Sequence, residues 1–156
     1  NLKSQNKLII IGNKKWWDTK TEKDFKNMRF KTDVIFLGSI KDDIMKLILA
    51  SAKALIFISI FEGFGIPIIE AMKSGVPVIT SNTSAMPEVA GNAALTVNPY
   101  DINEITAAIH KIDTSRELRN NLIKKGKERI KLFDWQKTSD GILKILKNQI
   151  NTNGKI

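Results

Sequence analysis

Cysteine is absent from this chain of 156 residues, and histidine occurs once, as His110. The first absence excludes disulfide bonds, Cys-ligated zinc, iron–sulfur clusters and cysteine nucleophiles. The single histidine excludes a metal site with several His ligands and leaves one position for the histidine of a Ser-His-Asp triad. We interpret His110, which lies in an expected helix, as a surface or packing residue.

Long apolar runs are also absent, since none approaches the roughly 20 residues that a membrane-spanning helix needs. The first seven residues lack the apolar region of a signal peptide. Residue 1 is Asn and not Met, so we expect this chain to be cut from a longer one. An apolar fraction of 42% and a mean hydropathy of −0.15 are typical of a soluble globular domain.

The net charge of +9 is unevenly distributed along the sequence. Residues 1–110 hold 13 Lys and Arg against 11 Asp and Glu, whereas residues 111–156 hold 12 against 5. The excess at helical spacing indicates either a solvated helix face or attraction to an anionic membrane surface or an acidic partner. No basic patch with interleaved aromatic residues and no nucleic-acid motif occurs, so we expect no nucleic-acid partner.

Short apolar runs alternate with segments of helical periodicity, a pattern typical of a parallel sheet covered on both faces. Strands are expected at 7–12, 33–38, 54–59, 77–80 and 94–97. Helices are expected at about 20–29, 42–52, 65–74, 101–112, 115–131 and 134–150. The pattern predicts an α/β fold with a Rossmann-like, doubly wound parallel sheet in one domain over 1–150, followed by a frayed tail at 151–156.

Ligands of such sheets bind outside the carboxyl ends of the strands. That rule places segments 12–15, 38–41, 59–65 and 80–84 on the functional edge. The polar run at 81–84 is either a set of turn formers or a set of hydroxyl ligands.

The segment from Phe61 to Met72 carries the strongest chemical signal. Gly63 and Gly65 flank one phenylalanine between a buried strand and a helix, and glycine lets the backbone approach a ligand closely. The free N–H groups at the helix start suit a phosphate. Glu70 falls one turn inside this otherwise apolar helix, so it either points back to the loop or is an exposed residue at one end of the helix.

The order of these residues resembles the C-terminal half of family 4 glycosyltransferases, which are retaining enzymes of the GT-B fold. The resemblance covers roughly residues 7–150. It rests on E-G-F-G-x-P-x-x-E-A-M at 62–72, S-G-V-P-V-I at 74–79, P-E-V-A-G-N-A-A at 87–94, N-P at 98–99, F-L-G at 36–38, Ser59 and F-D-W at 133–135.

The resemblance implies a role for each matching residue. Glu70 would hydrogen-bond the ribose hydroxyls, and Glu62 would be the catalytic residue that contacts the transferred sugar. The donor sugar and diphosphate would meet Gly63, Phe64, Gly65 and Ile66, and the base would be framed by Gly38, Ser39 and Ile40. Retention in this fold needs no metal, so no cofactor is expected besides the nucleotide-sugar substrate.

The implied activity is transfer of a hexosyl group from a nucleoside diphosphate sugar to a glycan or lipid-linked acceptor. A missing N-terminal domain would hold the acceptor, and the final helix would cross back to it through Leu143, Ile145, Leu146 and Ile150. The family's upstream Arg and Lys have no clear counterpart in 1–7, so the fragment alone is expected to be inactive. The expected setting is bacterial polysaccharide synthesis in the cytoplasm, with peripheral attachment to the inner face of the plasma membrane as an option.

Three alternatives of other classes remain at this point. One is a non-catalytic module that binds a nucleotide sugar or a phospho-ligand. Another is a nucleotide-sugar epimerase of the same fold, although those enzymes lack the E-G-F-G and P-E-V series. The last is a basic nucleic-acid-binding protein.

Overall fold

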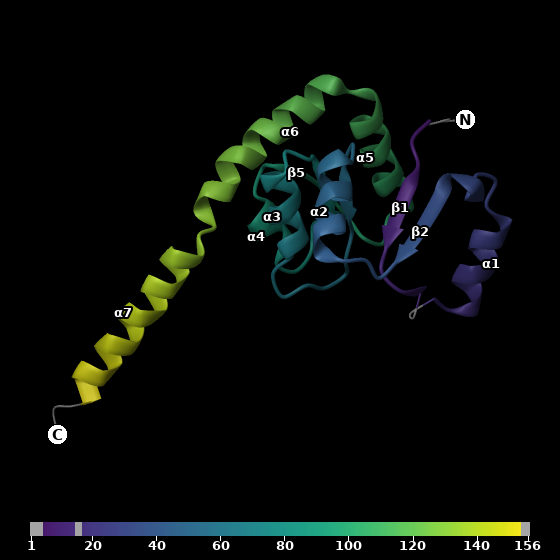
Figure 1. Ribbon diagram of the computed structural model, residues 1–156. Helices are drawn as coiled ribbons and strands as arrows, with labels where there is room; N and C mark the ends of the chain where they lie inside the picture. The colour runs from purple at the N-terminus through teal and green to yellow at the C-terminus, as the bar shows by residue number, and fades with distance from the viewer. Residues whose placement is uncertain (1–4, 15–16, 154–156) are drawn as a thin grey trace. The chain divides into compact units, whose positions relative to one another are not determined.

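The computed structural model describes residues 5–14 and 17–153, with side chains as far as residue 149 (Figure 1). The chain divides into two compact units, Asn1–Ala52 and Lys53–Ile156. Each unit contains parallel strands flanked by helices, as the sequence pattern predicts. The expected single domain over 1–150 stays a prediction.

Unit 1 holds a sheet of two parallel strands, β1 (Leu8–Ile11) and β2 (Val34–Gly38). Helix α1 (Thr19–Asn27) and the 3-10 turn η2 (Lys31–Asp33) connect the strands, and α2 (Asp42–Ser51) follows them. Consecutive parallel strands need a crossover connection. The helix predicted at about 20–29, between the first two apolar runs, is therefore confirmed as α1.

One face of the unit 1 sheet is filled by aromatic rings. Trp17, Phe25 and Phe36 meet edge to face, with ring centroids 5.2–5.5 Å apart. The Lys14 ammonium lies 3.7 Å from the Phe36 ring centroid. Asp18 begins α1 by accepting a hydrogen bond from the Thr21 N–H, and hydrogen bonding to Thr21 lowers the pKa of the Asp18 carboxyl. Lys15 and Trp16 lie outside the described residues.

The other face of the unit 1 sheet carries apolar side chains that remain exposed. Ile9, Ile35 and Leu37 are 44%, 40% and 37% exposed. The sequence predicted strands covered on both faces, and in unit 1 taken by itself this face stays partly exposed.

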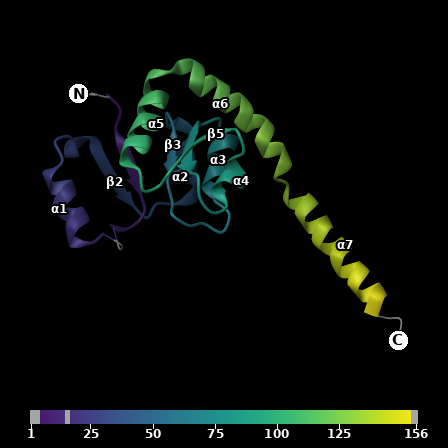
Figure 2. The same ribbon diagram turned by 180° about the vertical axis from the view of Figure 1, so that it is seen from behind.

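Unit 2 is built on three parallel strands in the order β3 (Leu55–Phe57), β4 (Val78–Ser81) and β5 (Ala94–Val97). Its helices are α3 (Ile66–Lys73), α4 (Met86–Ala90), α5 (Ile102–Thr114), α6 (Arg116–Arg129) and α7 (Trp135–Asn153), with the 3-10 turn η3 (Ile130–Leu132) between the last two. Helix α3 contacts β3 and β4, α5 contacts β5, and α6 contacts both α3 and α5. Figure 2 shows the same arrangement from behind.

The core of unit 2 surrounds the central strand, because all four residues of β4 are buried. Helix α3 contributes Ile68, Ala71 and Met72, each at most 2% exposed. Gly126 lets α6 approach α3 closely, since a Cβ at that position would lie 3.1 Å from the Met72 Cγ. This core fixes the start of α3, and therefore the loop that precedes it.

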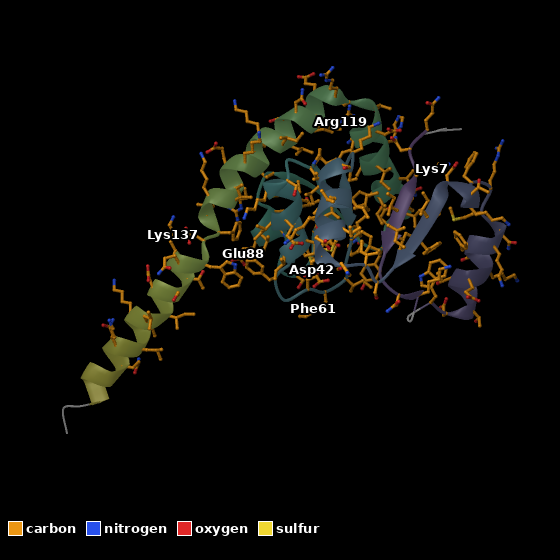
Figure 3. All side chains as sticks on the ribbon, viewed as in Figure 1. Lys7, Asp42, Phe61, Glu88, Arg119 and Lys137 are labelled. Carbon is orange, nitrogen blue, oxygen red and sulfur yellow. The ribbon has the colours of Figure 1, made fainter. Side chains whose placement is uncertain are left out.

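Side chains define the ends of the longer helices. Asp101 begins α5 by accepting from the Asn103 and Glu104 N–H groups. The Glu104 carboxylate accepts from the Asn98 N–H and not from the Asp101 N–H, so Asp101 and Glu104 do not form a reciprocal capping box. Arg119 of α6 donates to the Ile112 and Asp113 carbonyls at the end of α5 (Figure 3).

The last helix runs from Trp135 to Asn153, three residues past the expected end at 150. Its first residue, Trp135, is 84% exposed, and Ile142, Leu143, Ile145 and Leu146 are also exposed. The side chain of Ile150 lies outside the described residues. No helix among the described residues is long and apolar enough to cross a membrane.

Candidate functional site

The loop between β3 and α3 exposes a short series of side chains and glycines at the carboxyl end of a parallel strand. Phe61 is 80% exposed (Figure 3), and Phe64 is 45% exposed. Gly65 is buried and has φ +94° at the N-cap of α3. A Cβ there would lie 3.1 Å from Ile68 Cδ1, so both backbone conformation and space favour glycine.

Backbone donors gather at this helix start. Among the residues that the structure describes, the N–H groups of Gly63, Phe64 and Gly65 have no hydrogen-bond partner. The first N–H groups of any helix also lack an intrahelical acceptor, and the helix dipole places positive potential at the same point. The loop therefore presents an array of donors that is suited to an anion.

Glu62 is held from two sides. The Ser59 hydroxyl donates to Glu62 Oε1 at 2.9 Å. The Ser84 hydroxyl donates to the Glu62 carbonyl at 2.7 Å and accepts from the Glu62 N–H at 3.3 Å. The half-buried carboxylate keeps a second oxygen without a described partner, so it remains able to accept a hydrogen bond from a ligand.

Other hydroxyl groups tie the same loop to β4. Thr80 donates to the Phe57 carbonyl at 2.9 Å, Ser81 donates to the Ser59 carbonyl, and Thr83 donates to the Ile60 carbonyl at 3.1 Å. The sequence left open whether the run at 81–84 forms turns or binds ligands; Ser81, Thr83 and Ser84 support the loop. In the sequence, this supporting role was indicated only by the series of hydroxyl residues that begins in the buried strand β4 and continues past its end.

Glu70 lies one turn into α3, on the same face as the exposed Ile66. Helical side chains tilt toward the N-terminus, so this position lies behind the loop. Glu70 as a residue is half-buried, and no described side chain or backbone group forms a hydrogen bond or ion pair with its carboxylate. A role of this carboxylate at the loop stays a prediction.

The residues expected to frame the base belong to unit 1. Gly38 ends β2 with φ +64°, and its carbonyl accepts from the Gly12 N–H at 2.8 Å. The Asn13 amide donates to the Ser39 hydroxyl at 3.3 Å. Ile40 is half-buried directly after them. The ends of β1 and β2 thus meet within unit 1, and a role at the base remains a prediction.

The described residues contain no group of three or more His, Asp or Glu side chains that could hold a metal ion. His110 is exposed on α5 and takes no part in the loop. The chemistry on offer at the carboxyl ends of β3 and β4 is therefore two carboxylates and a set of backbone donors.

A parallel α/β domain with a glycine loop at a helix N-terminus and glutamates at 62 and 70 offers groups that are suited to a nucleotide or a phosphate. The comparison with protein families is more specific. Residues 1–129 match the family described as Glycosyl transferases group 1, and the chain belongs to that family. This confirms the glycosyltransferase resemblance that the sequence motifs indicated.

Curated relatives share a substantial part of the sequence. The chain is 31% identical over 129 residues to O-antigen chain mannosyltransferase B of Escherichia coli, which covers 83% of this chain and 34% of that protein. It is 38% identical over 106 residues to O-antigen chain mannosyltransferase RfbU of Salmonella typhimurium, covering 68% and 30%. The chain thus spans about a third of the length of these relatives.

Solved structures share the fold. Sucrose-phosphate synthase from Thermosynechococcus elongatus superposes with a TM-score of 0.79 at 24% identity, over 94% of this chain and 39% of that one. Anabaena Alr3699/HepE in complex with UDP and glucose gives a TM-score of 0.74 at 19% identity, over 91% and 40%. The Rossmann-like fold class is therefore confirmed.

Proposed function

We propose that this chain is the donor-binding domain of a retaining glycosyltransferase that transfers a hexosyl group from a nucleoside diphosphate sugar. The observation that carries the proposal is the glycine loop, in which the N–H groups of Gly63, Phe64 and Gly65 have no partner and precede a helix whose Glu70 carboxylate also has none among the described residues. These donors and this acceptor are open to a ligand that carries a phosphate and neighbouring hydroxyl groups.

The two ends of a nucleotide sugar match this arrangement. A ribose has two adjacent hydroxyl donors, which complement the two oxygens of the Glu70 carboxylate. The diphosphate complements the amides of Gly63, Phe64 and Gly65 and the start of α3, where Ile66 is the first helical residue. On the family resemblance alone, Gly38, Ser39 and Ile40 of unit 1 are the residues proposed to frame the base.

Glu62 is the proposed catalytic residue, and its carboxylate oxygen without a described partner would contact the transferred sugar. Transfer breaks the bond between the anomeric carbon and the phosphate oxygen and forms a bond from the same carbon to an acceptor hydroxyl oxygen, and the proton of that hydroxyl passes to the leaving diphosphate. Negative charge grows on the leaving diphosphate, and preorganised amides at a helix N-terminus stabilise it. Ser59 and Ser84 hold Glu62 in place before the donor arrives.

Mannose is the proposed sugar. Both curated relatives described above are named as mannosyltransferases, at 31% and 38% identity. The proposed acceptor is a glycan or a lipid-linked glycan, because those relatives are named for O-antigen chains. An N-terminal domain outside this chain would hold the acceptor, and the isolated fragment would not catalyse transfer. No metal is needed in this scheme.

Helix α7 suggests where the enzyme acts. Helical periodicity places its exposed apolar residues toward one face of the helix and Lys137, Lys144 and Lys147 toward the other. Lys137 is labelled in Figure 3. We propose that the apolar face contacts the acceptor domain and that the basic face attracts the anionic cytoplasmic face of the membrane. The enzyme would thus be cytoplasmic and peripheral, and it would not bind nucleic acid.

The proposal is tested with the full-length enzyme, which in this scheme includes the acceptor domain, as are the activity predictions below. It is incubated with GDP-mannose, and in parallel with UDP-glucose, and nucleoside diphosphate release is measured with and without a lipid-linked glycan acceptor. Acceptor-dependent release of one nucleotide and a product with the donor's anomeric configuration are expected. Tight binding of a sugar nucleotide without release of nucleoside diphosphate, whichever acceptor is added, would instead favour the non-catalytic binding module.

A further inference from the structure

We infer that Phe133 is a positioning residue for the donor, acting through Phe64 of the glycine loop. The inference rests on the proposed function, because it concerns how the donor loop is held. Phe133 lies between η3 and α7, about seventy positions after the loop in the sequence, and no motif spacing connects the two.

The first step is the contact itself. The Phe64 and Phe133 rings meet edge to face, with centroids 5.8 Å apart and an interplanar angle of 89°. This is the geometry that aromatic quadrupoles favour. Phe64 sits between Gly63 and Gly65, two residues whose backbones are freer than any other, so its own backbone adds little rigidity. The ring contact therefore adds an anchor at Phe64, between Glu62, which Ser59 and Ser84 hold, and the buried Gly65.

The second step is that Phe133 is itself held. Its N–H donates to the Ile130 carbonyl at 3.0 Å, which closes η3. The guanidinium carbon of Arg129 lies 5.4 Å from the Phe133 ring centroid. A cation at this distance from an aromatic face is attracted to it.

The third step fixes Arg129. Its Nε donates to the Val89 carbonyl at 3.1 Å, and its Nη2 donates to the Glu88 carbonyl. Gly91 makes room for this contact, because a Cβ there would lie 3.1 Å from the Arg129 Nε. Arg129 thus binds the last carbonyls of α4, and α4 contacts the central strand of unit 2.

These contacts form one continuous support from α4 through Arg129 and Phe133 to Phe64. The Phe64 N–H is one of the free donors proposed to meet the diphosphate. When the binding-competent loop conformation is less populated, the apparent dissociation constant rises in proportion. Loss of the Phe133 ring should therefore weaken donor binding without removing any group that touches the donor.

The test compares Phe133→Ala, Phe133→Tyr and Leu132→Ala by calorimetry with GDP-mannose and UDP-glucose on the full protein. Leu132 is the matched control, since it is an adjacent large apolar residue that is 64% exposed. Removing an edge-to-face contact corresponds to roughly a two- to twelvefold change in an equilibrium. We expect Phe133→Ala to raise the donor Kd by about that factor, and Phe133→Tyr and Leu132→Ala to bind as wild type does.

A second readout separates positioning from stability. Phe133→Ala should raise the donor KM while leaving the acceptor KM unchanged, and a Phe64→Ala/Phe133→Ala double variant should lose no more affinity than Phe64→Ala alone. Phe133→Leu serves if the alanine variant does not fold. Wild-type donor affinity in Phe133→Ala, or additive losses in the double variant, would overturn the inference while leaving the proposed function intact. Absence of sugar-nucleotide binding by wild type would instead overturn the proposed function.

Discussion

One hydroxyl group, that of Ser84, satisfies both backbone polar groups of Glu62: it donates to the carbonyl at 2.7 Å and accepts from the N–H at 3.3 Å. Ser84 is the one non-glycine residue with positive φ, at 55°, among the residues described. A non-glycine residue in this region costs roughly 1–2 kcal/mol, and such strain often lies at functional sites. The turn after β4 therefore carries strain at the point where it holds the proposed catalytic residue.

Two substitutions at Ser84 separate strain from hydrogen bonding. Ser84→Ala keeps the strain and removes both hydrogen bonds, each worth about 0.5–1.5 kcal/mol. Ser84→Gly removes the hydrogen bonds and the strain, so it should be more stable than Ser84→Ala by roughly 1 kcal/mol in denaturant unfolding. Both variants should have lower kcat than wild type. Full activity in both would mean that Glu62 does not depend on Ser84.

Glu62 should matter for the sugar and not for the bare nucleotide. Glu62→Gln keeps the size of the side chain but removes its charge, so turnover should fall while the Kd of UDP or GDP stays almost unchanged. Ser59→Ala, which removes only the hydroxyl on Oε1, should lower turnover by a smaller factor. A Glu62→Gln enzyme with wild-type kcat would return Glu62 to a structural role.

Glu70→Ala should weaken nucleoside diphosphate binding by roughly 1.5–3 kcal/mol, the range for hydrogen bonds to a charged group. Its melting temperature should not fall, because the carboxylate has no partner among the described residues. Glu88→Ala is the matched control, since that carboxylate is exposed on α4 (Figure 3). Equal loss of affinity in the two variants would remove the special role of Glu70.

Chelation should leave transfer unchanged if the scheme needs no metal. Activity with saturating donor would be measured after dialysis against EDTA and again after addition of Mg²⁺ or Mn²⁺. We expect the same kcat in all samples, because the leaving diphosphate is stabilised by amides and a helix N-terminus. Activity that disappears on dialysis and returns with the cation would contradict this part of the account.

The basic face of α7 predicts salt-dependent binding to anionic membranes. Each lysine near such a surface contributes about 1 kcal/mol, or roughly fivefold in partitioning, and salt screens the effect. Replacing Lys137, Lys144 and Lys147 by Gln should abolish co-sedimentation with anionic liposomes at low salt. Gln at Lys20, Lys23 and Lys26 of α1 changes net charge equally and is the control. If the intact protein ignores these liposomes at low ionic strength, the lysines only solubilise the helix.

Part of the C-terminal charge already has a structural use, which sequence alone did not reveal. Arg119 binds carbonyls at the end of α5, and Arg129 binds carbonyls at the end of α4. Lys131 pairs with Glu128 at 2.6 Å. The membrane hypothesis therefore rests on the remaining exposed lysines, and chiefly on those of α7.

The sequence predicted the helices and strands closely because their signals are local. Asp101 and Ser115, which begin α5 and α6, are typical capping residues, and the runs that became β3 and β4 are short and apolar. The exposure of Ile9 and Ile35 in unit 1 was not predictable, because an apolar strand sequence does not indicate which helices or strands will cover each of its faces.

The candidate site was predictable only where residues are close in sequence. Glu62, Gly65 and Glu70 lie within one loop and one helix, so their arrangement followed from helix geometry. Ser84 and Phe133, which support that loop, lie in the segments that follow β4 and η3. Their contacts depend on tertiary packing, which residue spacing in the sequence does not predict.

The central claim is that Glu70 binds the ribose of a nucleotide sugar donor. It is tested most directly by a thermodynamic cycle: calorimetry of the wild type and Glu70→Ala with the preferred nucleoside diphosphate and its 2′,3′-dideoxy analogue. The account predicts that the wild type loses about tenfold to 150-fold in affinity for the dideoxy analogue. Glu70→Ala should bind both nucleotides alike. An equal loss in both proteins, or no nucleotide binding by the wild type, would contradict the claim.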